Sequence, residues 1–156
     1  MDLAKQLEIE QLCTKVLSRY AVAVGQRDYD TFVDCFTEDG VWQRPGVPAL
    51  EGHEQILAFI STSRPPASLM RHVKGTVLVD VVDEDTATAI SYTTVYSHMG
   101  SSELMAPLER PLQVVEYHDV FKRVAEGEWR IARRDTSIPF RSADADAADA
   151  AKQKAK

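Results

Sequence analysis

The sequence M-R-H-V-K-G-T-V-L-V-D-V-V (70–82), followed by T-A-T-A-I-S-Y-T-T-V-Y-S-H (86–98), decides the fold class. Polar and apolar residues alternate in both stretches with a period of two, which predicts two long strands. The acidic turn at 83–85 joins them as a hairpin. Residues 112–124 and 129–138 repeat the pattern around a turn at 125–128, which predicts a second hairpin.

Helices are predicted before these strands. Apolar residues recur at three- and four-residue spacing from Ile9 to Val24, and Gly25 fits a helix end. Asp28 is predicted to cap a short second helix, and residues 53–61 a third helix. Between them, residues 37–40 are predicted to form a turn and residues 41–43 a short strand. This order predicts an α+β fold, a cone-shaped curved antiparallel sheet packed against about three N-terminal helices.

Composition limits the classes of partner. The chain has 156 residues, and its net charge of −6 disfavours nucleic acid and anionic membranes as partners. We expect one domain over residues 1–141 and a frayed or disordered Ala/Asp/Lys tail over 142–156, because the tail has no large apolar residue. Cys13 and Cys35 are expected to be buried thiols, and no secretion signal opens the sequence, so a cytoplasmic location is predicted.

Six segments, in order, carry a resemblance to a known family. They are R-D-Y-D-T-F-V-D-C-F-T-E-D-G-V-W (27–42), E-G-H-E-Q-I (51–56), M-R-H-V (70–73), D-E-D-T-A-T-A-I-S-Y (83–92), E-Y-H-D-V-F-K-R (116–123) and G-E-W-R-I-A-R-R (127–134). Together they resemble the SnoaL-like branch of the nuclear-transport-factor-two-like superfamily. The resemblance implies a cystatin-like α+β barrel with one deep apolar pocket, usually in a homo-oligomer (a dimer or trimer).

The same resemblance implies several activities. Members of this superfamily include polyketide cyclases, ketosteroid isomerase, scytalone dehydratase, hexachlorocyclohexane dehydrochlorinase and the largely structural β subunits of ring-hydroxylating dioxygenases. In the dehydratase and dehydrochlorinase relatives, a histidine at the position of His72 is the base. The expected ligand is therefore a small apolar or cyclic molecule, and no cofactor is expected, since a neutral imidazole can take a proton from an already acidified C–H group.

One acidic residue of the family pattern is missing. The relatives pair this histidine with an aspartate near the end of the first helix, and the matching position here is Gly25. Asp28 and Asp119 are the candidate acidic partners. The alternative for Asp28 is a helix cap, and the alternative for Asp119 is a salt bridge to Arg133 or Arg134 on the next strand.

The position of His72 also demands an irregular strand. Strict alternation puts His72 on the face opposite Val77 and its neighbouring valines. The two can share the pocket face only if the register shifts by one residue between them. We therefore predict a β-bulge near Lys74 and Gly75.

The remaining candidates are pocket-lining residues. They are expected to be aromatic or aliphatic and to favour a flat or ring-containing ligand: Tyr20, Val24, Trp42, Tyr92, Tyr96, Val115, Tyr117 and Phe121. No metal site is predicted, because Glu116, His118 and His98 lack further ligands at a fixed spacing.

Three functions remain open at this stage. The first is a cofactor-free lyase, isomerase or cyclase that uses His72 as its general base. The second is a binding module that has lost catalysis, which Gly25 favours. The third is a structural partner like a dioxygenase β subunit, with the open sheet face as its interface.

Overall fold

The computed structural model describes residues 1–101, 103–108 and 111–143. The predicted tail lies outside them except for Ser142 and Ala143. Within these ranges, three helices and six strands follow one another in the order α1 (Leu3–Gln26), α2 (Tyr29–Asp34), β1 (Phe36–Gln43), β2 (Leu50–Glu51), α3 (Gly52–Thr62), β3 (Ser68–Val81), β4 (Thr86–Met99), β5 (Gln113–Ala125) and β6 (Glu128–Arg141).

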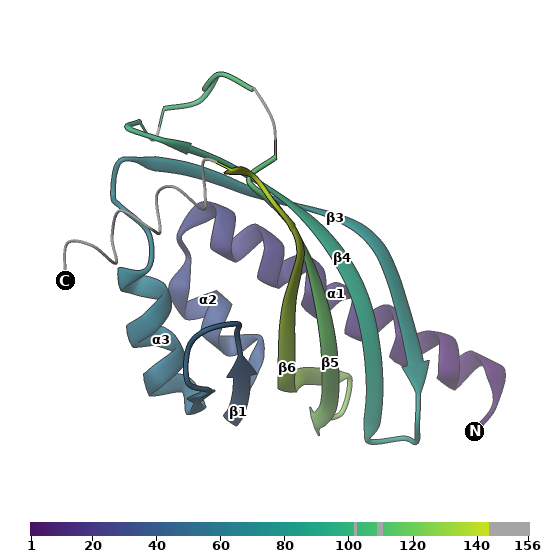
Figure 1. Cartoon of the computed structure of the whole chain (residues 1–156). Helices are drawn as coiled ribbons and strands as arrows, with labels where there is room; N and C mark the ends of the chain where they lie inside the picture. Colours follow the sequence, from purple (N-terminus) through teal and green to yellow (C-terminus); the bar gives the residue numbers. More distant parts are fainter. Residues whose placement is uncertain (102, 109–110, 144–156) are drawn as a thin grey trace.

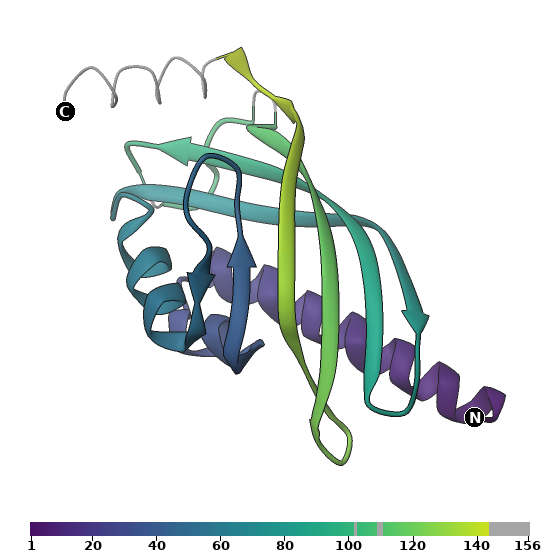
Figure 2. The ribbon, with the colours of Figure 1, turned by 60° about the horizontal axis from the view of Figure 1, so that its bottom comes forward.

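All six strands form one sheet in the order β2-β1-β6-β5-β4-β3. Neighbouring strands are antiparallel except β1 and β6, which are parallel. The long strands curve over α1 without closing into a barrel, and α2 and α3 lie beside α1 (Figures 1 and 2). The prediction of an α+β fold with three N-terminal helices and a curved sheet is confirmed.

Helix α1 buries the face that its spacing predicts, including Ile9, Cys13, Leu17 and Tyr20. It ends one residue beyond Gly25, and the left-handed residue that follows is Arg27, with φ 61°. This conformation costs a non-glycine residue about 1 kcal/mol or more. The Arg27 guanidinium offsets that cost by donating to the backbone oxygens of Pro65 and Pro66, which precede β3, and of Ser68, its first residue.

Both cysteines are buried and free, as predicted. Burial raises the pKa of the Cys13 thiol to about 12 and that of Cys35 to about 11. Neither thiol is therefore ionised near neutral pH, and both act as small apolar groups in the core.

The predicted turn at residues 37–40 is wrong. These residues belong to β1, which begins at Phe36 and shifts register against β6 between Phe36 and Val41. The sequence T-E-D-G is typical of a turn because its residues are polar and end in glycine. Here it forms a bulged stretch within the strand. Gly40 is packed so closely that an added Cβ would lie 2.9 Å from the backbone oxygen of Thr37.

The predicted bulge in β3 is confirmed. The pairing with β4 shifts between Lys74 and Val77, and Gly75 and Thr76 are both exposed at the shift. As a result, His72 and Val77 are both partly buried on the inner side of the sheet. The extra residue is what allows the two halves of this strand to share one face.

Strand β6 runs three residues further than the predicted end at Ile138. Pro139 cannot donate a ladder hydrogen bond, which argues against a strand at this point. The structure accommodates Pro139 at a register shift opposite Val115, between the pairs Glu116–Ser137 and Val114–Phe140. The extension matters because Ile138 and Arg141 reach the cavity described below.

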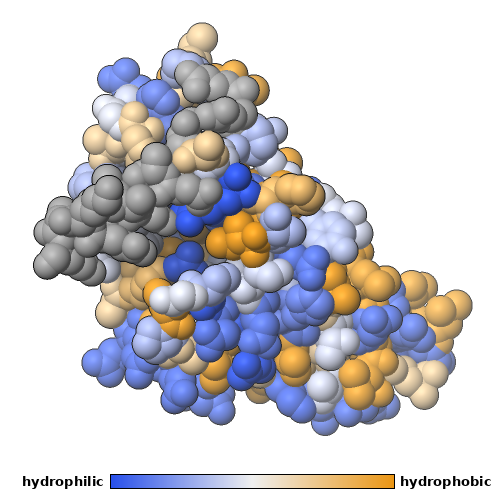
Figure 3. All heavy atoms as spheres, in the orientation of Figure 1, coloured by the Kyte–Doolittle hydropathy of each residue, from blue (hydrophilic) through white to orange (hydrophobic). Residues whose placement is uncertain are grey.

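The surface carries hydrophobic side chains interspersed with hydrophilic ones on the face seen in Figure 3. Those of Leu3, Leu7 and Val82 are more than half exposed. Scattered exposure of this kind is normal for a folded domain. None of the helices in the described part of the chain is long and apolar enough to cross a membrane.

Replacement of Gly40 by Ala is expected to destabilise the fold by about 1–3 kcal/mol, because backbone atoms on two strands would have to move. Gly25→Ala is the matched control. Its Cβ would meet its nearest neighbour at 3.5 Å, and alanine favours a helix by about 1 kcal/mol over glycine. Urea unfolding of both variants checks this, and equal stability of the two would contradict the packing described for Gly40.

Candidate functional site

A cavity of about 390 Å³ lies between the helices and the inner face of the sheet. Its walls come from the end of α1, from α3, from Trp42 of β1 and from the four long strands. Ligand cavities in proteins typically measure about 300–1,000 Å³. The volume is therefore suited to one small molecule.

Six of the residues singled out from the sequence line this cavity: Tyr20, Val24, Trp42, His72, Val115 and Tyr117. They come from four different elements: α1, β1, β3 and β5. The Trp42 indole nitrogen donates to the Thr136 hydroxyl at 3.0 Å, which fixes the ring against the last strand. The Tyr20 ring packs against Trp42 and Tyr117 at centroid distances of 6.4 and 5.9 Å.

Three predicted lining residues are not in the cavity wall. Tyr92 and Tyr96 lie on the other face of β4, where Tyr92 is 44% exposed, while Ser91, Thr93 and Val95 are buried. The sequence shows that the two tyrosines share a face but does not show which face is inside. Phe121 is fully buried, but it lies in the core further along β5, two residues beyond Asp119.

Sequence reasoning missed the cationic part of the wall. Arg44, which follows β1, and Arg64, which follows α3, both line the cavity. Arginine is usually exposed, so neither position suggests a cavity residue on its own. The only sequence signal is their position directly after an element that was itself predicted to pack inward.

His72 projects from β3 into this cavity beside Tyr20, with 6.2 Å between the two ring centroids. Its Nδ1 is buried and has no hydrogen-bond partner among the described residues. Burial, followed by the positive charges of Arg134, Lys74, Arg64 and Arg44, lowers the pKa of His72 to about 3. The imidazole is therefore neutral near pH 7.

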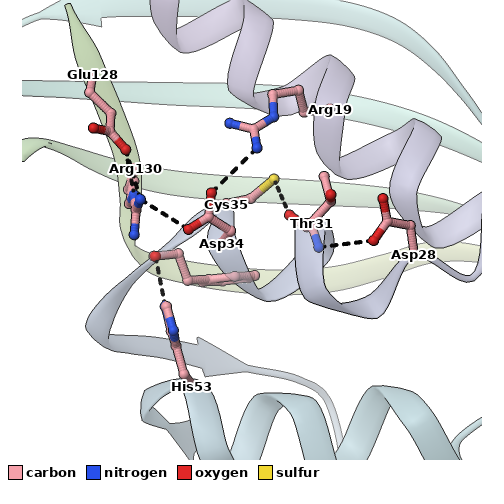
Figure 4. Close-up of polar contacts among 9 residues, drawn as sticks. Arg19, Asp28, Thr31, Asp34, Cys35, His53, Glu128 and Arg130 are labelled. Carbon is pink, nitrogen blue, oxygen red and sulfur yellow. Dashed lines mark hydrogen bonds and ion pairs between the residues drawn. The ribbon is translucent and has the colours of Figure 1, made fainter.

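Neither candidate acidic partner is beside His72. Asp28 caps α2 by accepting from the Thr31 backbone N–H at 3.1 Å, as Figure 4 shows. Asp119 is paired with Arg134. Both interpretations that the sequence offered as alternatives, the helix cap and the salt bridge, are thus correct, and the interpretation of these residues as partners of His72 is wrong.

The Asp119–Arg134 pair is bidentate and fully buried. The Arg134 Nε and Nη2 donate to the two carboxylate oxygens at 2.7 and 2.8 Å. Burial lowers the pKa of Arg134, but the Asp119 carboxylate more than offsets this and raises it above its ordinary value. The guanidinium carbon lies 4.1 Å from the ring centroids of both Tyr20 and Tyr117. Arg134 therefore holds two cavity tyrosines in place by cation–π contact.

Tyr117 remains protonated in this setting. Burial, followed by the neighbouring Tyr20, raises the pKa of the Tyr117 phenol well above its usual value. A protonated phenol in the cavity wall is a hydrogen-bond donor for a carbonyl oxygen. No group of three or more His, Cys, Asp and Glu side chains in the described ranges could hold a metal ion.

Comparison with protein families gives one match that spans most of the chain, the SnoaL-like domain, over residues 3–135. The chain belongs to this family. Comparison with curated proteins finds none that matches.

Solved structures match over most of the chain at low identity. ActVI-ORFA from Streptomyces coelicolor is 20% identical, with a TM-score of 0.73 over 84% of this chain and 97% of its own. A protein from Catenulispora acidiphila in complex with S-DNPA is 23% identical, with a TM-score of 0.67 over 85% and 95%. A scytalone dehydratase-like protein from Novosphingobium aromaticivorans is 15% identical, with a TM-score of 0.69 over 85% of each chain. These likenesses show the shared fold.

The buried ion pair yields a stability prediction. Replacing Asp119 with Asn is expected to cost about 3–5 kcal/mol, because Arg134 would stay buried without a countercharge. The control is Asp135→Asn, which breaks a pair with Arg133 whose side chains are 51% and 44% exposed and should cost less than about 1 kcal/mol. Urea unfolding compares the two, and similar losses would argue against a special role for the buried pair.

The lowered pKa of His72 predicts acid sensitivity. The pKa of His72 falls from 6.5 in the unfolded chain to about 3 in the folded chain. Between these pH values the unfolded chain binds one proton that the folded chain does not, so stability falls as the pH drops from 6.5 towards 3. Between pH 7.5 and 5 the loss from this residue is about 2 kcal/mol. His72→Gln should remove that part of the pH dependence in urea unfolding. An unchanged dependence would show that His72 titrates normally in the folded protein.

Proposed function

We propose that this protein is a cofactor-free enzyme that moves a proton on a small, mostly apolar, ring-containing molecule, as in isomerases, lyases and cyclases. The observation that carries the proposal is the neutral imidazole of His72. The side chain projects into an aromatic cavity, and its buried Nδ1 has no hydrogen-bond partner among the described residues. A buried polar atom without a partner is costly, so a site for a ligand is a good reason for it.

The chemistry starts from a ligand whose C–H group lies next to a carbonyl. His72 takes that proton, and the electron pair of the C–H bond moves onto the carbonyl oxygen to give an enolate. Tyr117 can donate a hydrogen bond to this oxygen. Return of the proton to another carbon gives isomerisation, whereas expulsion of a leaving group from the next carbon gives elimination.

The shape of the cavity supports a flat ligand. Tyr20, Trp42 and Phe59 all line it, and Trp42 and Phe59 pack edge to face with 5.7 Å between ring centroids. Aromatic walls favour stacking and edge contacts with a ring system. The complex of the Catenulispora protein with S-DNPA and the scytalone dehydratase-like neighbour agree with small-molecule chemistry on this fold. At their low identity they support the proposal only by analogy.

A second candidate is a binding module without catalysis. It is favoured by a specific observation, the pKa of His72 at about 3, because a general base works best when its pKa lies near the working pH. Among the described residues, no carboxylate lies beside the imidazole to stabilise its protonated form. The enzyme proposal therefore requires the bound ligand to raise the pKa of His72.

The two candidates differ in whether His72 exchanges protons with a ligand. We would incubate the purified chain with β-tetralone, a bicyclic aryl ketone, in D₂O and follow loss of the acidic C–H signal by NMR. Wild-type protein should accelerate the exchange, and His72→Gln should slow it by about 100-fold or more. Tyr92→Phe, on the outer face of the sheet, is the control and should leave the rate unchanged.

Equal exchange rates for the wild type and His72→Gln would refute His72 as the base. Saturable binding of the ketone with no exchange above the background rate would support the binding module instead.

A further inference from the structure

The ionisable side chains in the described cavity wall include no carboxylate. They are arginines, tyrosines and His72, although the whole protein has a net charge of −6. The charges that act on His72 are likewise all positive: Arg134 from β6, Lys74 from β3, Arg64 after α3 and Arg44 after β1. The described part of the cavity wall is therefore positively charged, although the protein as a whole is acidic.

Arg64 is built into the wall. The residue is only 9% exposed, and its Nη1 donates to the backbone oxygen of Val24 at 2.9 Å. Its Nε is buried without a hydrogen-bond partner, and no carboxylate pairs with it among the described residues. Burial lowers the pKa of Arg64, and the charges of Arg27 and Arg71 add to this effect. A buried guanidinium with an open N–H group is a strong site for an anion.

Arg44 lies against the aromatic part of the same wall. Its guanidinium carbon is 4.6 Å from the ring centroid of Phe59 and 5.1 Å from that of Trp42. These rings hold the plane of the guanidinium by cation–π contact. The rings do not accept hydrogen bonds from the guanidinium N–H groups as a carboxylate would. None of the described carboxylates pairs with Arg44.

We propose that the ligand of this cavity is an aryl or polycyclic carboxylate. Its carboxylate group binds Arg64 and Arg44, and its ring system packs against Tyr20, Trp42 and Phe59. The inference rests on the proposed function only in taking this cavity as the ligand site, and it holds whether or not His72 transfers a proton.

The ligand charge would also change His72. The groups that face the imidazole are cations or tyrosines, so a bound carboxylate supplies the only negative charge near it among the described residues. An opposite charge nearby favours the protonated form of histidine. The ligand carboxylate thereby stabilises the protonated imidazole, as the relatives' aspartate at the position of Gly25 is expected to do. Ligand binding then raises the pKa of His72.

The test compares charged and neutral forms of one probe on the full chain. Naphthoate and its amide, naphthamide, have nearly the same shape and differ in charge. Isothermal titration calorimetry should give at least tenfold tighter binding of naphthoate, consistent with a charge-assisted hydrogen bond. Equal or tighter binding of naphthamide would overturn the proposal. Failure of naphthoate to bind at up to about 10 mM would also overturn it.

Two variants and a control locate the anion. Arg64→Gln and Arg44→Gln should each weaken naphthoate binding by about 10- to 100-fold and leave naphthamide binding nearly unchanged. Arg133→Gln, which removes the same charge from the exposed outer surface, should change neither. The contacts of the Arg44 guanidinium with the described residues are with rings, so its variant remains informative if Arg64→Gln unfolds, as circular dichroism would reveal. Unchanged naphthoate binding in a folded Arg44→Gln variant would overturn the proposal.

The naphthoate-binding test can succeed or fail independently of the proton-exchange test of the proposed function. His72→Gln should still bind naphthoate, because the carboxylate contacts the arginines. In the wild type, the His72 imidazole signals followed by NMR should show a higher pKa with naphthoate than without it. If naphthoate binds but the His72 pKa stays unchanged, the carboxylate lies elsewhere and the proposal fails, while the proton-exchange assay with the ketone still decides catalysis independently.

Discussion

The buried ion pair of Asp119 and Arg134 is the interaction on which the inner face of the sheet depends. Both side chains are fully removed from solvent, and two short hydrogen bonds join them across β5 and β6. Such a pair stabilises a fold only when its geometry is good, because both ions lose their hydration. Here the guanidinium also lies against two tyrosine rings, so one contact fixes the sheet register and the cavity wall together.

The ion pair explains why the histidine is unusual. With Asp119 committed to Arg134, the cavity has cations around His72 but no anion among the described residues of its wall. An added Cβ at Gly25 would meet neighbouring atoms at ordinary contact distances. Lack of space is therefore not the reason for a glycine at this position.

The parts of the fold that could be predicted are those set by local patterns. Periodicity predicted α1 and both hairpins, and the need to bring His72 and Val77 onto one face predicted the bulge at Gly75. The turn at residues 37–40 was wrong because a bulged strand uses the same polar and glycine residues as a turn. Tyr92 was misplaced because alternation defines two faces without saying which is buried. Arg44 and Arg64 could not be found, since their burial depends on how distant elements pack.

The bulge in β3 has a further consequence for how the molecule behaves among its own copies. β3 is the last strand of the sheet, so one of its sides has no neighbouring strand. A long, straight strand in that position invites another chain to add to it, which is a common route to aggregation. The irregularity at Gly75 interrupts the even spacing of backbone groups along this edge, and the exposed Arg71 and Asp80 add charge to the strand. The feature that brings His72 to the cavity thus also protects the open edge of the sheet from self-association.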